Sequence, residues 1–214
     1  MINLIGIFDS GKGAHFVADR LSKLIPGRKY LVQTDEKNAP YGLKTSEQIT
    51  KLTKEAIKQL VDKDCNPIVI ACNTVTTSSI KLIREHYPSV EFIGFEPMIK
   101  PAVEQSKNRS IMVLATPATL RSSRYQYLKR TFAQNCKIIE PDCSEWAKMI
   151  DSGNEKYINL EIISNQIKSN DCDAVVLACT HYIKLIDRLQ SIDPGINILE
   201  PTEFIANRII SLGY

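Results

Sequence analysis

The segments Asp64-Cys65-Asn66-Pro67-Ile68-Val69-Ile70-Ala71-Cys72 and Asp171-Cys172-Asp173-Ala174-Val175-Val176-Leu177-Ala178-Cys179 share one pattern: an acidic residue, a cysteine, a short apolar run and a second cysteine. Their final cysteines are 107 residues apart (179 − 72), which is half of the 214-residue chain. A short apolar run bounded by polar residues is typical of a buried β-strand. The two segments therefore predict an internal duplication, with one cysteine at the end of the same strand in each half.

Two further pairs of landmarks support this duplication. The apolar runs that end in Asp9 and Thr116 share one plan, and Thr116 stands 107 residues after Asp9. Glu96-Pro97 recurs as Glu200-Pro201 at an offset of 104. A repeat of domain size indicates two related halves and not a solenoid. Chance similarity among α/β units is the alternative, and three landmarks at nearly one offset disfavour it.

Short apolar runs alternate along the chain with longer stretches of helical period. Strands that are apolar on both faces and separated by helices are typical of parallel sheets covered on both sides. We therefore predict an α/β fold with two pseudo-symmetric parallel-sheet domains, 1–96 with 201–214 and 97–200, and an active site in the cleft between them. The expected strands are 3–8, 29–33, 67–71, 91–95, 110–115, 136–140, 174–178 and 196–199. The expected helices are 13–24, 44–62, 76–87, 99–106, 119–133, 144–151, 155–168, 182–191 and 202–212.

Composition indicates an ordinary globular protein. Hydrophobic residues make up 43% of the chain and charged residues 24%, values usual for globular domains. A net charge of +3 without a block of Lys and Arg predicts neither a nucleic-acid nor a membrane partner. No apolar run reaches the roughly 18 residues of a membrane span, and the first residues lack the pattern of a signal peptide. We therefore expect a cytoplasmic protein.

The six cysteines form three pairs, each with a spacing of seven residues. In a cytosolic chain they are expected to be reduced thiols. Structural zinc ligands are normally spaced more closely, so no metal site is predicted. Cys65, Cys136 and Cys172 are expected to be small buried residues beside strands, whereas either a structural or a functional role fits Cys143.

Four polar or reactive residues follow predicted strands at their carboxyl ends: Asp9, Cys72, Thr116 and Cys179. In open parallel sheets, ligands bind at this edge. Cys72 and Cys179 each precede small polar residues and a predicted helix, whose N-terminal N–H groups lower the pKa of a thiol. Such a thiol suits proton transfer in either direction. One such cysteine would be interpreted as packing, but two at equivalent repeat positions favour function.

Two thiols that face one cleft from opposite sides suit inversion at a carbon atom. One base removes a proton from one face while an acid delivers a proton to the other, so the pattern predicts a racemase or epimerase. The turn Asp9-Ser10-Gly11-Lys12-Gly13-Ala14 lacks the third glycine of a dinucleotide fingerprint and the lysine pattern of a P-loop. We interpret its glycines as allowing close backbone approach to a small anion.

Together these motifs resemble those of glutamate racemases, members of the cofactor-independent Asp/Glu racemase superfamily. The resemblance covers nearly the whole chain and implies interconversion of L- and D-glutamate without a cofactor, supply of D-glutamate for peptidoglycan, and a homodimer. The matching motifs are Phe8-Asp9-Ser10-Gly11, Asp35 with Pro40-Tyr41-Gly42, Ala71-Cys72-Asn73-Thr74, Glu96-Pro97, Ala115-Thr116-Pro117-Ala118-Thr119 and Cys179-Thr180-His181-Tyr182.

The same resemblance implies a role for individual residues. Cys72 would exchange the proton on the D-glutamate face and Cys179 the proton on the L-glutamate face. Asp9 would assist Cys72 and His181 would assist Cys179, while Asp151 stands where the family generally has a supporting Glu. The implied substrate-binding residues are Ser10, Tyr41, Gly42, Asn73, Thr74, Thr116, Thr119 and Thr180.

The chain departs from the family's pattern at four positions. Lys12 and Ala14 replace the usual Val and Gly, Asp151 is shorter than Glu, and Ile183 replaces a proline. Two alternatives therefore stay open: a racemase of aspartate or another small acidic substrate, and a glutamate-binding regulatory protein without catalysis. His181 and the Pro-Tyr-Gly run count against aspartate. A purely binding protein would bind glutamate without exchanging its α-proton, which separates the two classes.

Overall fold

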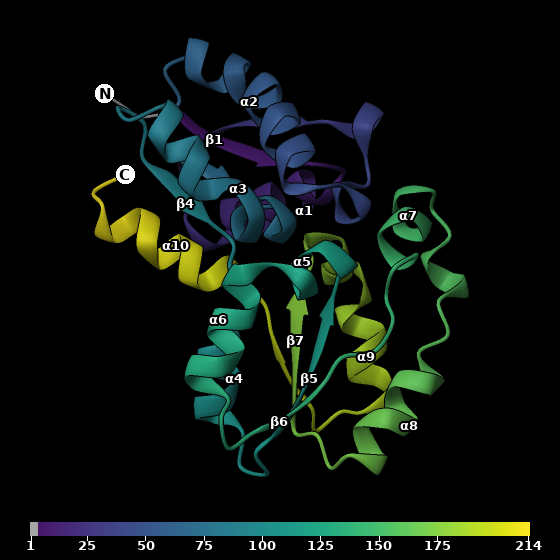
Figure 1. The fold of residues 1–214 in the computed structure, drawn as a ribbon. Helices are drawn as coiled ribbons and strands as arrows, with labels where there is room; N and C mark the ends of the chain where they lie inside the picture. Colours follow the sequence, from purple (N-terminus) through teal and green to yellow (C-terminus); the bar gives the residue numbers. More distant parts are fainter. Residues whose placement is uncertain (1–3) are drawn as a thin grey trace. The chain divides into compact units, whose positions relative to one another are not determined.

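The computed structural model describes residues 4–214, which divide into two compact units. Unit 1 comprises Met1–Glu96 with Pro201–Tyr214, and unit 2 comprises Pro97–Glu200. Each unit holds one four-stranded parallel sheet flanked by helices (Figure 1). The predicted α/β fold with two parallel sheets is therefore confirmed; the first residue of the expected strand 3–8 lies outside the described residues.

The two sheets are built on one plan. The strands are β1 Leu4–Asp9, β2 Lys29–Thr34, β3 Ile68–Ile70 and β4 Phe92–Gly94 in unit 1, and β5 Ser110–Ala115, β6 Lys137–Ile139, β7 Ala174–Ala178 and β8 Asn197–Leu199 in unit 2. Their spatial orders are β2-β1-β3-β4 and β6-β5-β7-β8, with every neighbouring pair parallel. The second order is the first order repeated, as the duplicated sequence pattern predicts.

Helices cover both faces of the first sheet. They are α1 Gly13–Leu24, α2 Ser46–Asp62, α3 Asn73–His86 and α10 Thr202–Ser211, with short 3-10 helices η1 Glu36–Asn38 and η2 Tyr41–Leu43. The first helix packs against α10, and α2 packs against α3. Apolar side chains of the helices and of β1, β3 and β4 form a buried core that includes Phe8, Ile57, Ile70 and Phe92.

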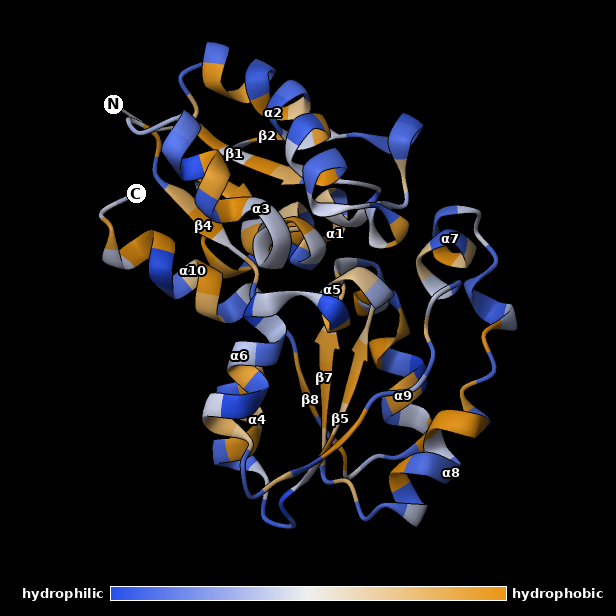
Figure 2. Cartoon of the chain, in the orientation of Figure 1, coloured by the Kyte–Doolittle hydropathy of each residue, from blue (hydrophilic) through white to orange (hydrophobic). Residues whose placement is uncertain are grey.

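The second sheet is covered in the same manner. Its helices are α4 Ile99–Gln105, α5 Pro117–Arg121, α6 Ser123–Phe132, α7 Trp146–Asp151, α8 Glu161–Ser169 and α9 Ile186–Ile192, with 3-10 helices η3 Glu155–Tyr157 and η4 Thr180–Leu185. Helices α4 and α6 lie on one face, and α8 and α9 on the other (Figure 1). Figure 2 shows that β7 is apolar along its length and β5 along most of it, while the helices alternate. Within residues 4–214, no helix has the length and apolar character needed to cross a membrane.

Several predicted helices differ from those observed. The predicted helix 119–133 is two helices, because Ser122 has an extended backbone (φ −64°, ψ 143°) and its Oγ accepts the Tyr125 N–H to cap α6. The predicted helix 155–168 is η3 followed by α8, and 182–191 is η4 followed by α9. Helix α3 begins at Asn73 and not at 76, because tertiary packing overrides the weak helix propensity of its β-branched first turn.

The repeated Asp-Cys pair has a backbone role in both halves. Asp64 and Asp171 follow the ends of α2 and α8 with φ of 54° and 53°. The N–H of the next residue, Cys65 or Cys172, bonds to the carbonyl five residues earlier, at 3.1 and 2.9 Å. This is the hydrogen bond of a Schellman motif, in which aspartate takes the left-handed position usually given to glycine. The two Asp-Cys pairs therefore end equivalent helices and redirect the chain into β3 and β7.

Gly94 is required where α3 crosses β4. A Cβ atom at this position would lie 2.5 Å from Ile80 Cδ1 and 2.6 Å from Thr76 Cγ2. Real Cβ atoms do not approach other atoms so closely, so the side chains of Ile80 and Thr76 on α3 must move to admit any side chain at position 94.

We expect Gly94→Ala to lower the free energy of unfolding by about 1–3 kcal/mol, the usual cost of overpacking a core. Urea denaturation measures this change. Gly195→Ala is the matched control, since its Cβ would meet only Asp193 Oδ1 at 3.8 Å, and it should change the free energy by less than about 0.5 kcal/mol. Equal effects of the two substitutions would contradict the close packing at Gly94.

Candidate active site

In each sheet, two adjacent strands lead into polar or reactive side chains at their carboxyl ends. In unit 1, β1 ends at Asp9 and Cys72 follows β3, and these strands pair in parallel. In unit 2, Thr116 follows β5 and Cys179 follows β7, which also pair in parallel. Parallel strands end at the same edge of a sheet, so each unit holds one such pair where ligands of open α/β sheets bind.

Cys72 lies directly before the first turn of α3. It is the N-cap residue of this helix and is only 6% exposed. Its Sγ lies 3.3 Å from the Oγ of Ser10, on the loop after β1. The free N–H groups of a helix N-terminus stabilise negative charge, and the Ser10 hydroxyl can donate to a thiolate or accept from a thiol. The surroundings of Cys72 therefore suit both protonation states.

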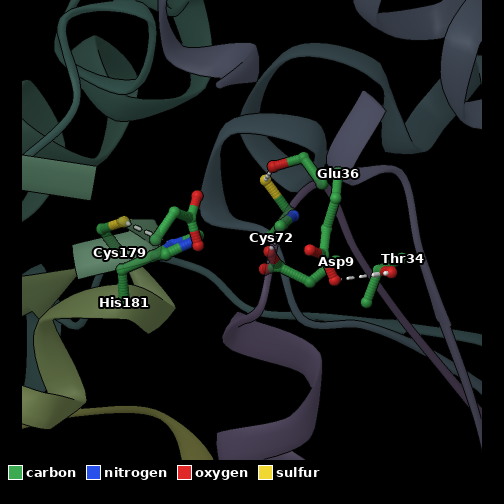
Figure 3. Close-up of polar contacts among 9 residues, drawn as sticks. Asp9, Thr34, Glu36, Cys72, Cys179 and His181 are labelled. Atoms are coloured by element: carbon green, nitrogen blue, oxygen red, sulfur yellow. Dashed lines mark hydrogen bonds and ion pairs between the residues drawn. The ribbon is translucent and has the colours of Figure 1, made fainter. Parts of the chain in front are cut away.

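Asp9 is fully buried beside this thiol. Its Oδ1 accepts the N–H of Gly11 at 2.8 Å, a contact that offsets part of the cost of burying a carboxylate. Figure 3 shows Glu36 extending from η1 toward Asp9, and Thr34 Oγ1 donates to Glu36 Oε1 at 3.4 Å. Sequence reasoning gave Glu36 no role, and it adds a second carboxylate at this edge.

Tyr41 is fixed by residues that sequence reasoning did not place in the site. Its side chain is 1% exposed, and its hydroxyl donates to Asp35 Oδ2 at 2.6 Å. Asn38 Nδ2 donates to both carboxylate oxygens of Asp35 at 2.9 and 3.0 Å. Burial, the Asp35 contact and the charges of Asp35, Cys72 and Asp9 raise the pKa of Tyr41. Tyr41 therefore stays a neutral hydrogen-bond donor, and the buried Gly42 follows it in η2.

The amide of Asn73 is buried without internal partners. The residue is 2% exposed, and neither Nδ2 nor Oδ1 bonds to any residue between 4 and 214. Thr74, next in the first turn of α3, is 3% exposed. A buried polar group without a partner costs about 1–3 kcal/mol. The amide offers two donors and an acceptor to a ligand at the end of β3.

Three side chains of unit 2 form a chain of contacts that starts at Cys179. The Sγ of Cys179 lies 3.6 Å from Nδ1 of His181, and Nε2 of His181 lies 3.0 Å from Oδ1 of Asp151 (Figure 3). Cys179 and His181 are 7% and 4% exposed. The arrangement of nucleophile or base, imidazole and carboxylate is the triad geometry that orients the imidazole and stabilises its protonated form. Asp151 reaches the imidazole with its shorter side chain.

Cys179 and Cys72 differ in the helix that follows them. Cys179 precedes η4, a 3-10 helix of six residues, and not the α-helix that the sequence predicted. The dipole of so short a segment is small, because it sums over few peptide units. The polar partner of Cys179 is thus the imidazole of His181, whereas Cys72 has the Ser10 hydroxyl and the first turn of α3 beside it.

Threonines line the edge of the sheet of unit 2. Thr116 caps α5, where its Oγ1 accepts the Thr119 N–H at 3.4 Å and donates to Thr119 Oγ1 at 3.1 Å. Thr119 is fully buried. Thr180 opens η4 and is 2% exposed. Unit 1 thus holds Asp9, Ser10, Tyr41, Gly42, Cys72, Asn73 and Thr74 of the predicted site, and unit 2 holds Thr116, Thr119, Asp151, Cys179, Thr180 and His181.

The other four cysteines are kept neutral by burial. Desolvation raises the pKa of Cys65, Cys136 and Cys172, and it raises the pKa of Cys143 to about 12, with the charges of Asp142 and Cys179 adding to the rise. Cys136 is partly exposed and not buried as predicted, because it lies in the turn before β6, at the margin of the sheet. In the part of the chain that the structure describes, no group of three or more His, Cys, Asp or Glu could hold a metal ion.

Comparison with known proteins identifies the family of this architecture. The family model for Asp/Glu/hydantoin racemases matches residues 17–209. The chain belongs to the Asp/Glu/hydantoin racemase family. The predicted resemblance is thereby confirmed, and the family covers elements of both sheets.

Individual relatives agree with this assignment. A glutamate racemase of Clostridium botulinum is 36% identical over 92% of this chain and 78% of its own length. A glutamate racemase of Sulfurovum sp. is 36% identical over 97% of this chain and 82% of its own length. The crystal structure of Escherichia coli glutamate racemase in complex with L-glutamate and the activator UDP-MurNAc-Ala matches with a TM-score of 0.88 and 27% identity, over 99% of this chain and 82% of that chain.

The raised pKa of Cys143 predicts a loss of stability at alkaline pH. The folded protein holds this proton up to about pH 12, whereas the unfolded thiol loses it near 9. The folded state then binds more protons, so stability is fully present below the unfolded pKa and falls as pH rises toward 12. We expect Cys143→Ala to reduce this fall by up to about 1.4 kcal/mol per pH unit. Urea denaturation between pH 8 and about 11 tests this, and an unchanged slope would contradict it.

Proposed function

We propose that this protein is a glutamate racemase that interconverts L- and D-glutamate with two thiol bases, Cys72 and Cys179. The observation that carries the proposal is the presence of one buried thiol at the carboxyl edge of each sheet, each with a polar partner that can exchange its proton: Ser10 at 3.3 Å and His181 at 3.6 Å. Membership of the racemase family and 36% identity to glutamate racemases support glutamate as the substrate.

In the proposed reaction, each thiol acts on one face of the α-carbon. The thiolate of Cys179 takes the α-proton of L-glutamate, and the thiol of Cys72 gives a proton to the opposite face to yield D-glutamate. The thiols then exchange protonation states with solvent before the next turnover, and the reverse reaction uses the same groups in opposite roles. The assignment of Cys179 to the L face follows the resemblance to the family. The proposal requires the two units to close on one substrate, with residues 1–96 and 201–214 forming one racemase domain and 97–200 the other.

The groups beside each thiol would control its charge. His181 accepts the Cys179 proton at Nδ1 when its Nε2–H donates to Asp151, and the carboxylate stabilises the imidazolium that results. On the other side, Asp9 and Ser10 would assist Cys72, together with the first turn of α3. Glutamate needs no electron-withdrawing cofactor in this proposal, because donors around its α-carboxylate lower the cost of forming the carbanion.

Substrate binding is proposed for the polar residues at both edges. The unsatisfied amide of Asn73 can donate to a carboxylate and accept from the ammonium group. The neutral Tyr41 hydroxyl already donates its proton to Asp35, so its oxygen can accept from the ammonium group. Hydroxyls and backbone N–H groups supply further donors for the two carboxylates. The full proposed set is Ser10, Tyr41, Gly42, Asn73, Thr74, Thr116, Thr119 and Thr180. We further propose a cytoplasmic homodimer that supplies D-glutamate for peptidoglycan.

Proton NMR of the purified protein in deuterated water tests the two-thiol reaction. With L-glutamate we expect loss of the α-proton signal and appearance of D-glutamate, and much slower exchange with L-aspartate. Cys72→Ala and Cys179→Ala should each reduce racemisation by about 10²–10⁴-fold, the usual worth of a general acid or base. Cys65→Ala and Cys172→Ala are matched controls, since these buried thiols lie seven residues earlier in the same repeats, and they should retain activity.

The single-thiol variants also separate the two faces. With Cys72 removed, Cys179 can still withdraw and return a proton on its own face, so L-glutamate should exchange its α-proton slowly without inversion while D-glutamate does not. Cys179→Ala should show the opposite preference. A folded protein that binds glutamate but exchanges no α-proton would contradict the racemase and support the regulatory binding protein. Faster α-proton exchange with aspartate than with glutamate would identify aspartate, and not glutamate, as the substrate.

Asp151 is proposed as a positioning residue for His181. Asp151→Asn should lower kcat/KM by at least about tenfold, because the imidazolium loses its carboxylate. The two enantiomers have equal free energy in water, so kcat/KM must fall equally in both directions. The limb of the pH–rate profile that belongs to His181 should move to lower pH, and Asp151→Glu should restore both. A merely structural role would leave the pH profile unmoved.

A further inference from the structure

Unit 2 contains a cavity that the proposed racemase reaction does not use. Its volume is about 300 Å³, and it is lined by residues at the end of β5, on α5 and on the loop after β6. This volume lies at the lower end of the range of small-molecule sites. At about 30 Å³ for each water molecule, it holds the equivalent of about ten waters, which is the size of an amino acid.

The cavity lies at the same carboxyl edge of the sheet as Thr116 and Cys179, beside these candidate active-site residues. In the strand order β6-β5-β7-β8, β6 and β7 lie on opposite sides of β5. Cys179 follows β7, whereas the cavity is lined by Glu140, Pro141 and Asp142, which follow β6. From the end of β5, the cavity thus lies toward β6 and Cys179 lies toward β7.

The lining of the cavity includes a cation without an internal partner. Arg121 ends α5 and lines the cavity. Among residues 4–214, no side-chain hydrogen bond or ion pair involves its guanidinium group. Guanidinium is planar and binds carboxylates through two parallel N–H bonds. Arg121 is therefore available to an external anion.

The lining also includes two carboxylates that the protein holds in place. Glu140 Oε1 accepts from the hydroxyl of buried Tyr125 at 2.6 Å and from Lys129 Nζ at 2.7 Å. Asp142 Oδ1 accepts the N–H of Ser144 at 2.9 Å, and hydrogen bonds from Ser144 hold the pKa of Asp142 below its usual value. Hydrogen bonds thus orient both carboxylates before any ligand arrives. Lys129 balances Glu140, so Asp142 contributes the uncompensated negative charge.

Apolar side chains form the rest of the lining. Pro117, Leu120 and Pro141 line the cavity together with the Ala115 Cβ, and Pro141 is buried. A simple anion would meet repulsion from Asp142 and Glu140, and a simple cation would leave Arg121 unpaired and repel it. A zwitterion with an apolar body can pair with Arg121 and with Asp142 and can pack against the apolar residues of the lining.

We propose that this cavity is a second binding site, specific for a small zwitterionic ligand: an α-amino acid with an apolar side chain. Its carboxylate binds Arg121, its ammonium group binds Asp142 with Glu140 nearby, and its side chain packs on Pro117, Leu120 and Pro141. The site lies on α5, whose N-cap is Thr116, so an occupant braces the turn that carries Thr116 and Thr119.

Titration of the full-length ¹⁵N-labelled protein with L-leucine tests the site. We expect saturable shifts of the Leu120 and Cys143 amide signals with a Kd near 1 mM, which corresponds to about 4 kcal/mol. Leucinamide lacks the carboxylate and N-acetyl-leucine lacks the ammonium group, so each should bind at least about fivefold more weakly. L-leucine has no acidic side chain, so the result is independent of glutamate racemisation.

Substitutions of Arg121 and Asp142 test whether these two charged side chains bind the ligand. Arg121→Gln and Asp142→Asn should each weaken L-leucine binding at least about fivefold, and both positions are exposed, so the fold is retained. Arg124→Gln is the matched control, because Arg124 lies on α6 with its guanidinium over the Tyr127 ring, and it should leave the Kd unchanged. Absence of saturable shifts at about 50 mM L-leucine, or equal binding of leucinamide, would overturn the proposal.

Discussion

Parallel pairing of β1 with β3, and of β5 with β7, is the constraint on which the proposed chemistry depends. The registers align Phe8 with Ile70 and Ala115 with Ala178. The residues that follow each pair therefore leave the sheet at one edge, where Asp9 comes beside the Cys72 segment and Thr116 beside Cys179. A shift of one residue in either register would turn every following side chain to the other face. Helices on both faces bury these strands and make such a shift costly.

The two halves share this backbone plan and solve the same chemical problem with different partners. Both end the preceding helix at a left-handed aspartate, Asp64 or Asp171, and both place a thiol after the third strand of the unit. One thiol meets a hydroxyl and a helix N-terminus, and the other meets an imidazole with its carboxylate. Catalysis of a reaction between mirror images needs two groups that each reach both protonation states. It does not need those groups to have the same surroundings.

The sequence predicts the strands, their shared edge and the thiols well, because each depends on a local pattern of apolar and small residues. It does not predict contacts that depend on how a loop folds back. Asp35 and Asn38 hold Tyr41 through side-chain hydrogen bonds, and Glu36 extends toward Asp9 from a 3-10 turn with no periodic signal (Figure 3). Ser122 breaks a continuous helical pattern because its hydroxyl caps the next helix. In each case the local structure is determined by side-chain hydrogen bonds, which leave no hydrophobic periodicity in the sequence.

Two candidate active-site residues of unit 1 lower the stability of the folded protein. Asp9 is a fully buried carboxylate, and the amide of Asn73 is buried without a partner in residues 4–214. An unsatisfied amide costs about 1–3 kcal/mol, and neither packing nor a backbone cap at this position recovers that energy. A ligand that carries both a carboxylate and an ammonium group recovers it on binding, because it supplies an acceptor for Nδ2 and a donor for Oδ1. The energy that the unsatisfied amide costs in the free protein thus favours binding of such a ligand. This amide lies in the first turn of α3, directly after Cys72.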